Sequence, residues 1–160
     1  MLMNTQEYLS IIENIKSEIT AAQYRAAVHA NTDMLLLYHD IGRVINEHKS
    51  WGNKFIDNLA ADIRIAFPES KGYSVRNLKY MAKFAEIYSD REFVQQVVAQ
   101  IPWGHNIVLM DKISNMDERN WYIKKSAENG WSRNVLVHQI ESGLYQRQVL
   151  ADKVTNFEHR

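Results

Sequence analysis

The chain has 160 residues, of which 46% are hydrophobic and 24% are charged, a balance typical of one folded domain and not of a disordered segment. The 19 Lys and Arg residues balance 19 Asp and Glu residues, which argues against a surface that attracts nucleic acid everywhere. The chain contains no cysteine, signal peptide or long apolar run, so disulfides and thiolate zinc sites are excluded and we expect a cytoplasmic protein with no membrane partner.

Apolar residues recur at three- and four-residue intervals along most of the chain, and Pro68 and Pro102 are the only prolines. This spacing predicts an all-α fold with long N-terminal helices followed by two helix-turn-helix-like units. We expect a single all-helical domain over residues 5–147. Its parts are N-terminal helices over 5–49, a first unit over 51–90 and a second helical unit over 91–147, with a polar tail or the start of a linker over 148–160.

The N-terminal helices are predicted to begin after Asn4 or Thr5 and to continue to about residue 49. They are either one continuous helix or are broken near residue 20 or within the polar stretch 29–33. Residues at helical spacing form an apolar stripe on the first part, namely Leu9, Ile12, Ile15 and Ile19.

The first unit is predicted to be a helix over 53–67, a tight turn and a second helix opened by Ser74. Phe67 is expected to face inward at the end of the first of these helices. In the second unit, Asp90 is expected to cap a helix, and Asn115 with Glu118 has the form of a capping box. Gly130 is expected to end that helix and Ser132 to cap the last one.

Both units contain the same local pattern, in which Gly, an aromatic residue and a capping Ser are followed by Arg and Asn. In the first unit one residue separates Ser74 from the Arg-Asn pair, and in the second unit the pair follows Ser132 directly. In a helix-turn-helix protein, the residues at the start of the second helix contact base edges while nearby cations hold phosphates. We therefore predict DNA as the partner. The predicted contacts are Lys71, Ser74, Arg76, Asn77, Lys79, Tyr80 and Lys83 in the first unit, with Arg133 and Asn134 as helpers in the second.

Two alternatives stay open for these residues. The exposed face of the first unit is equally consistent with an ordinary solvated helix surface, and the mixed charge of the second unit favours protein contact or core packing. A different class of function is an interaction scaffold, in which the N-terminal helices form an interaction surface or a homodimer and the two units are a rigid scaffold that docks a nuclease or another protein. The neutral net charge favours the scaffold, and the net positive stretch from Lys71 to Arg91 favours DNA.

We find no catalytic constellation in the sequence. It has no P-loop and no GxGxxG motif, and His39-Asp40 and His105 lack a nucleophile or an oxyanion holder beside them. The histidines show no ligand spacing, so we predict no metal and no cofactor. We expect that this chain by itself is not an enzyme.

Several motifs follow one another in a specific order, namely Trp51-Gly52, Phe67-Pro68, Lys71-Gly72-Tyr73-Ser74, Arg76-Asn77-Leu78-Lys79-Tyr80-Met81, Pro102-Trp103-Gly104-His105-Asn106 and Gly130-Trp131-Ser132-Arg133-Asn134. On these motifs, over residues 10–147, the chain resembles the N-terminal domain of the YhcG-type family of bacterial proteins, a domain of unknown function. The resemblance implies a DNA-targeting part that precedes a PD-(D/E)XK nuclease domain. The chain ends at Arg160, where a linker to that nuclease would begin, so cleavage is not expected of it. A weaker likeness links the second unit to the helix-turn-helix of ParB-like proteins.

Overall fold

The computed structural model describes the backbone of residues 5–158 and the side chains of residues 5–155. Within this part of the chain every regular element is a helix, which confirms the all-α prediction. The elements, in chain order, are α1 Thr5–Glu47, the 3₁₀ turn η1 Lys49–Trp51, α2 Gly52–Ala66, α3 Val75–Ile87, α4 Arg91–Gln96, the 3₁₀ turn η2 Val98–Gln100, α5 Trp103–Lys112, α6 Met116–Asn129, α7 Arg133–Glu141 and α8 Leu144–Glu158.

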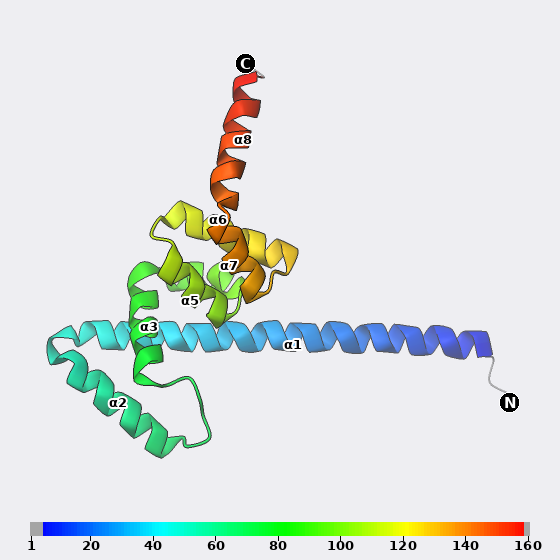
Figure 1. Ribbon diagram of the computed structural model, residues 1–160. Helices are drawn as coiled ribbons and strands as arrows, with labels where there is room; N and C mark the ends of the chain where they lie inside the picture. Colours follow the sequence, from blue (N-terminus) through cyan, green and yellow to red (C-terminus); the bar gives the residue numbers. More distant parts are fainter. Residues whose placement is uncertain (1–4, 159–160) are drawn as a thin grey trace.

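Helix α1 is one unbroken helix of 43 residues, so neither of the possible breaks exists. Figure 1 shows it as a straight rod whose N-terminal part projects away from the other helices. Residues 5–30, which we call the arm, are exposed along their whole length except for the half-buried Ile12. At 1.5 Å per residue the arm is about 39 Å long. The remainder of α1 belongs to the globular part, where Leu35 is completely buried.

Helix α3 packs directly across the C-terminal part of α1, and a glycine permits the close approach. A Cβ atom on Gly42 would lie 1.9 Å from the carbonyl oxygen of Met81, a distance that no larger residue can tolerate. Around this crossing Leu35, Leu78 and Phe84 are fully buried. The α1–α3 crossing is therefore the centre of the first half of the core.

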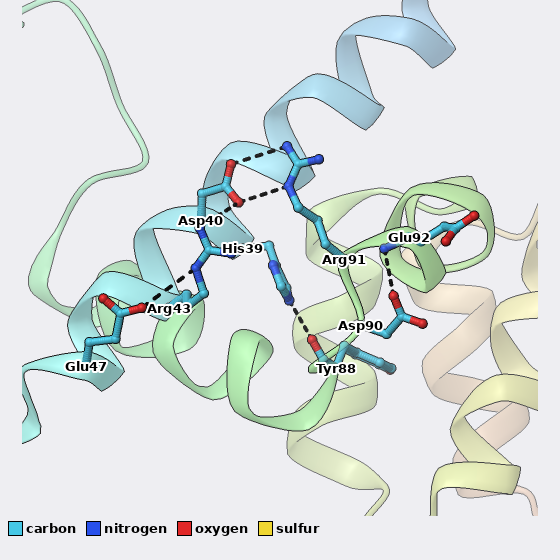
Figure 2. Close-up of polar contacts among 8 residues, drawn as sticks. All are labelled: His39, Asp40, Arg43, Glu47, Tyr88, Asp90, Arg91 and Glu92. Carbon is cyan, nitrogen blue, oxygen red and sulfur yellow. Dashed lines mark hydrogen bonds and ion pairs between the residues drawn. The ribbon is translucent and has the colours of Figure 1, made fainter.

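Polar contacts fix α1 to the junction of α3 and α4 (Figure 2). Asp40 accepts hydrogen bonds from Nε and Nη2 of Arg91, at 3.0 and 3.3 Å. The buried His39 donates from Nε2 to the carbonyl oxygen of Tyr88. Asp90 caps α4, as predicted, by accepting from the backbone N–H of Glu92.

Helices α5, α6 and α7 form the second half of the core, and the predicted start and end of α6 are confirmed. Asn115 accepts from the backbone N–H of Glu118 at 2.9 Å and so caps α6. Gly130 ends α6 in the left-handed conformation, with φ of 60°. Tyr122 and Leu136 are completely buried between these helices.

One local expectation is wrong. Phe67 was predicted to face inward but is 60% exposed, because α2 leaves the globular part after its first turns and contributes only Ile56 to the buried core. Residues 148–158, where we expect a polar tail or the start of a linker, continue the helix α8, which projects from the globular part in Figure 1. The last two residues of that tail, 159 and 160, lie outside the described residues.

Candidate nucleic-acid interface

The connection between α2 and α3 occupies residues 67–74. These eight residues are more than the three or four that join the helices of a helix-turn-helix, so the expected tight turn is not formed here. Ser74 nevertheless caps α3 as predicted, since its Oγ accepts from the backbone N–H of Asn77 at 3.1 Å. Gly72, with φ of 104°, provides the left-handed turn just before the cap.

The Asn77 side chain is used inside the protein. Its amide nitrogen donates to the carbonyl oxygen of Gly72, and its amide oxygen accepts from Nε1 of Trp103 at 2.8 Å. A base edge would need the same two groups, because an asparagine pairs with adenine through both its oxygen and its nitrogen. Asn77 therefore connects the loop to the start of α5 and is not available as a direct base contact.

Three cations project from the solvent side of α3. Arg76, Lys79 and Lys83 are separated by three and four residues, so they share one face of the helix, and all three are exposed. With Tyr80 and Val75 they line a shallow hollow on the surface. We call Arg76, Lys79, Tyr80 and Lys83 the α3 face.

Lys71 extends the positive surface beyond the start of α3. It lines a second hollow, which also includes Arg64 and Ser74 and which shares Val75 with the α3 face. The ammonium groups of Lys71 and Lys79 are exposed, and neither makes a hydrogen bond or an ion pair with a described residue. Both groups are therefore open to an anion from solution.

Tyr80 connects the α3 face to one carboxylate. Its hydroxyl donates to Asp111, with O–O distances of 2.9 and 2.8 Å, and this hydrogen bond raises the pKa of the phenol. The guanidinium carbon of Arg76 lies 5.2 Å from the centre of the Tyr80 ring, which is a cation–π contact. Lys83 donates from Nζ to the carbonyl oxygen of Met110 at 3.1 Å. The face thus consists of three cations with Asp111 at its border.

The second unit has a shorter connection. Only Gly130, Trp131 and Ser132 separate α6 from α7, and Ser132 caps α7 by accepting from the backbone N–H of Val135 at 3.2 Å. Arg133 and Asn134 follow the cap and are exposed.

The structure connects the two units through the segment 102–105, an arrangement that sequence reasoning missed. Trp103 bonds to Asn77 in the first unit, and His105 donates from Nε2 to the carbonyl oxygen of Trp131 in the second, at 2.8 Å. A Cβ on Gly104 would lie 3.9 Å from Cδ of Arg133. The starts of α3, α5 and α7 are therefore held near one another. The available signal was the repeated Gly-aromatic-Ser pattern with an unassigned Trp-Gly-His motif between its two copies.

Neither histidine considered as a general acid or base is placed for that role. His39 and His105 both direct Nε2 to a backbone carbonyl, and both are buried. Among the described residues no group of three or more His, Asp or Glu side chains could hold a metal ion. Within the same residues no helix combines the length and the apolar character that crossing a membrane requires.

Comparison with known proteins gives one match. The family model of the DUF1016 N-terminal domain matches residues 14–147. No curated protein and no solved structure matches the chain, and the weaker likeness to ParB-like proteins has no support. Because the match covers most of the chain, this protein belongs to the DUF1016 N-terminal domain family, which is the N-terminal domain of the YhcG-type proteins.

Proposed function

We propose that the chain is a DNA-binding module and that the α3 face together with Lys71 is its contact surface. The observation that carries this proposal is the local charge. Four exposed cations, Lys71, Arg76, Lys79 and Lys83, lie along one continuous surface, and Asp111 accepts a hydrogen bond from Tyr80 on the α3 face. Two more carboxylates border this surface, since Asp57 lines the hollow of Lys71 and Glu86 lines a hollow with Lys79 and Lys83, so the cations outnumber the carboxylates by four to three. Such a local excess of positive charge attracts the phosphate backbone even when the net charge of the protein is zero.

Within this surface the residues have different parts in binding. Lys71, Lys79 and Lys83 are point charges suited to phosphates, while the guanidinium of Arg76 has the fork geometry that contacts guanine or a phosphate with two hydrogen bonds. Ser74 acts indirectly, because its hydroxyl already caps α3. The backbone N–H groups of the first turn of α3 add a partial positive charge to the same end of the surface.

Arg133 and Asn134 are proposed as helpers. They begin α7, which the 102–105 segment holds near the start of α3. Lys112 is paired with Glu141 and Lys124 lies near Glu128, so the second unit offers less free positive charge than the first. We therefore assign it a minor part in affinity.

The family suggests how DNA binding is used. A domain of this type placed before a PD-(D/E)XK nuclease would bring the nuclease to DNA without supplying catalytic residues itself. In this proposal the described residues provide affinity and placement, and cleavage belongs to a downstream nuclease domain.

The test is a charge reversal that leaves the fold unchanged. Lys71→Glu/Lys79→Glu alters two lysines that have no recorded internal partner, and we expect DNA affinity to fall by about tenfold or more, with a shallower dependence on salt. Electrophoretic mobility shifts or fluorescence anisotropy at several salt concentrations measure both effects. The matched control is Lys124→Glu/Lys153→Glu, which changes the net charge equally on α6 and α8 and should retain most of the affinity. Equal losses in the two variants would reject the α3 face as the contact surface.

A second function is supported by a separate observation, which is the arm. A projecting helix with exposed isoleucines is typical of a protein-interaction element, so the chain is also a candidate scaffold that docks a nuclease or another protein. The two functions use different residues and are compatible in one molecule.

A further inference from the structure

The arm carries an apolar stripe, here taken as Tyr8, Ile12, Ile15 and Ile19, that is not packed against the hydrophobic core of the described residues. Tyr8, Ile15 and Ile19 are 44%, 44% and 51% exposed, although they recur at the spacing that normally places side chains in a core. Ile12, which is half-buried, completes the row. A helix of this kind is marginal alone in water, because most helical stability in proteins comes from packing an apolar face. We therefore expect another helix to cover the stripe.

The stripe faces away from the globular part of its own chain. Leu37 and Val44 are exposed on α1, whereas Leu35 and Gly42 are buried against the other helices. Ile19 lies 18 residues before Leu37, which is five turns of a helix with 3.6 residues per turn, and so it shares the free face. A second molecule can thus lie along the stripe without meeting the globular part.

The charge of the arm argues against DNA as its partner and is compatible with a second arm. Three glutamates against Lys16 and Arg25 give the arm a net charge of −1, so it is a poor match for the phosphate backbone of DNA. A second arm, in contrast, is nearly neutral and carries the same isoleucines. His29 and Asp33, whose side chains lie 3.4 Å apart, interrupt the stripe and so limit the apolar part to the projecting segment.

Two arms also complement one another in detail. When they are laid antiparallel with Ile12 of one arm opposite Ile15 of the other, Tyr8 comes opposite Ile19, and each large apolar residue of the stripe meets another. In this register Lys16 lies opposite Ile11, and Glu18 lies opposite Leu9, so no like charges are opposed. The two globular parts lie at opposite ends of the pair.

We infer that the arm is a self-association element, and that its occupant is the arm of a second copy of this chain. The inference goes beyond the DNA-binding proposal and does not depend on it, because the two use different residues. It assigns the exposed isoleucines of α1 to a helix–helix interface between two chains.

The experiment measures the mass of the full chain in solution over a range of concentrations, by light scattering and sedimentation. We expect the wild type to have the mass of two chains. Ile15→Glu/Ile19→Glu should raise the dissociation constant by about a hundredfold or more and give a monomer, since it places charges in the apolar interface. Helical content, measured by circular dichroism, should fall as the unpaired arm loses support, while tryptophan fluorescence of the globular part stays unchanged.

The matched control places the same two charges on the opposite face of the arm. Ser17 and Tyr24 lie five turns before the buried Leu35 and Gly42, and both are exposed, so Ser17→Glu/Tyr24→Glu should remain a dimer. A wild type that stays monomeric at high concentration would overturn the inference. The same holds if both double variants are dimers, which would place the interface elsewhere, or if both are monomers, which would show that the stripe is not specific.

Discussion

Asn77 holds two parts of the molecule together with a single amide group. It donates to Gly72 in the α2–α3 loop and accepts from the buried Trp103 at the start of α5. Asn77→Ala leaves a carbonyl and an indole N–H without their partner, and we expect it to lower the free energy of unfolding by about 1–3 kcal/mol. Urea unfolding followed by tryptophan fluorescence measures this change.

The neighbouring Arg76 supplies the control. Its side chain is exposed, so Arg76→Ala should change stability by less than about 0.5 kcal/mol while weakening DNA binding. Asn77→Ala should show the reverse pattern, with lower stability but unchanged DNA affinity under conditions where it is folded. Loss of DNA affinity in a fully folded Asn77→Ala protein would mean that the amide contacts the ligand after all.

At the residue scale, the sequence predicts local hydrogen bonds better than long-range ones. The caps Ser74, Asp90, Asn115 and Ser132 were predictable because each bonds to a backbone N–H two or three residues away. The part of Asn77 was not, since Trp103 lies 26 residues further along the chain. The exposure of the cations could be predicted, but the internal use of the asparagine beside them could not.

At the scale of elements, Gly42 determines how closely α1 and α3 cross. Gly42→Ala would force a methyl group into the backbone of Met81, and the built Cβ lies only 1.9 Å from that carbonyl oxygen. We expect a loss of about 1–3 kcal/mol or more, despite the better helix propensity of alanine. Thermal unfolding by circular dichroism checks this. Gly104→Ala is the matched helical control, because its nearest neighbour would be 3.9 Å away, and it should be neutral or stabilising. Equal effects at the two positions would contradict the crossing.

Helical periodicity predicted the elements better than their packing. For α3 the helical spacing of Leu78, Met81 and Phe84 matches the face that is buried. The same periodicity in the arm and at Phe67 did not lead to burial, because an apolar stripe indicates that a helix needs a partner and does not say whether that partner is in the same chain. The end of α2, in contrast, was predicted to within one residue, since α2 ends at Ala66 and Pro68 marks its end in the sequence.

At the scale of the whole molecule, the arm and the globular part have separate sources of stability. The buried hydrophobic residues among those described begin at Leu35, and Asn31 makes the first tertiary hydrogen bonds of α1, donating to the carbonyl oxygens of Ala99 and Ile101 at 2.9 and 3.2 Å. The α3 face lies entirely within the globular part. Self-association and DNA binding should therefore be separable by removing the arm.

Deletion of residues 1–28 should leave a folded protein that unfolds with the same midpoint as the full chain, within a few degrees, when both are compared at concentrations that favour monomers. It should retain the affinity of a single chain for a short duplex, because no cation of the α3 face is removed. Deletion of residues 1–34 is the control, since it also removes Asn31 and exposes the helix end at Leu35, and we expect it to cost about 1–3 kcal/mol. If the shorter deletion already abolished cooperative unfolding, the arm would have to be part of the folding unit, and the division between arm and globular part would fail.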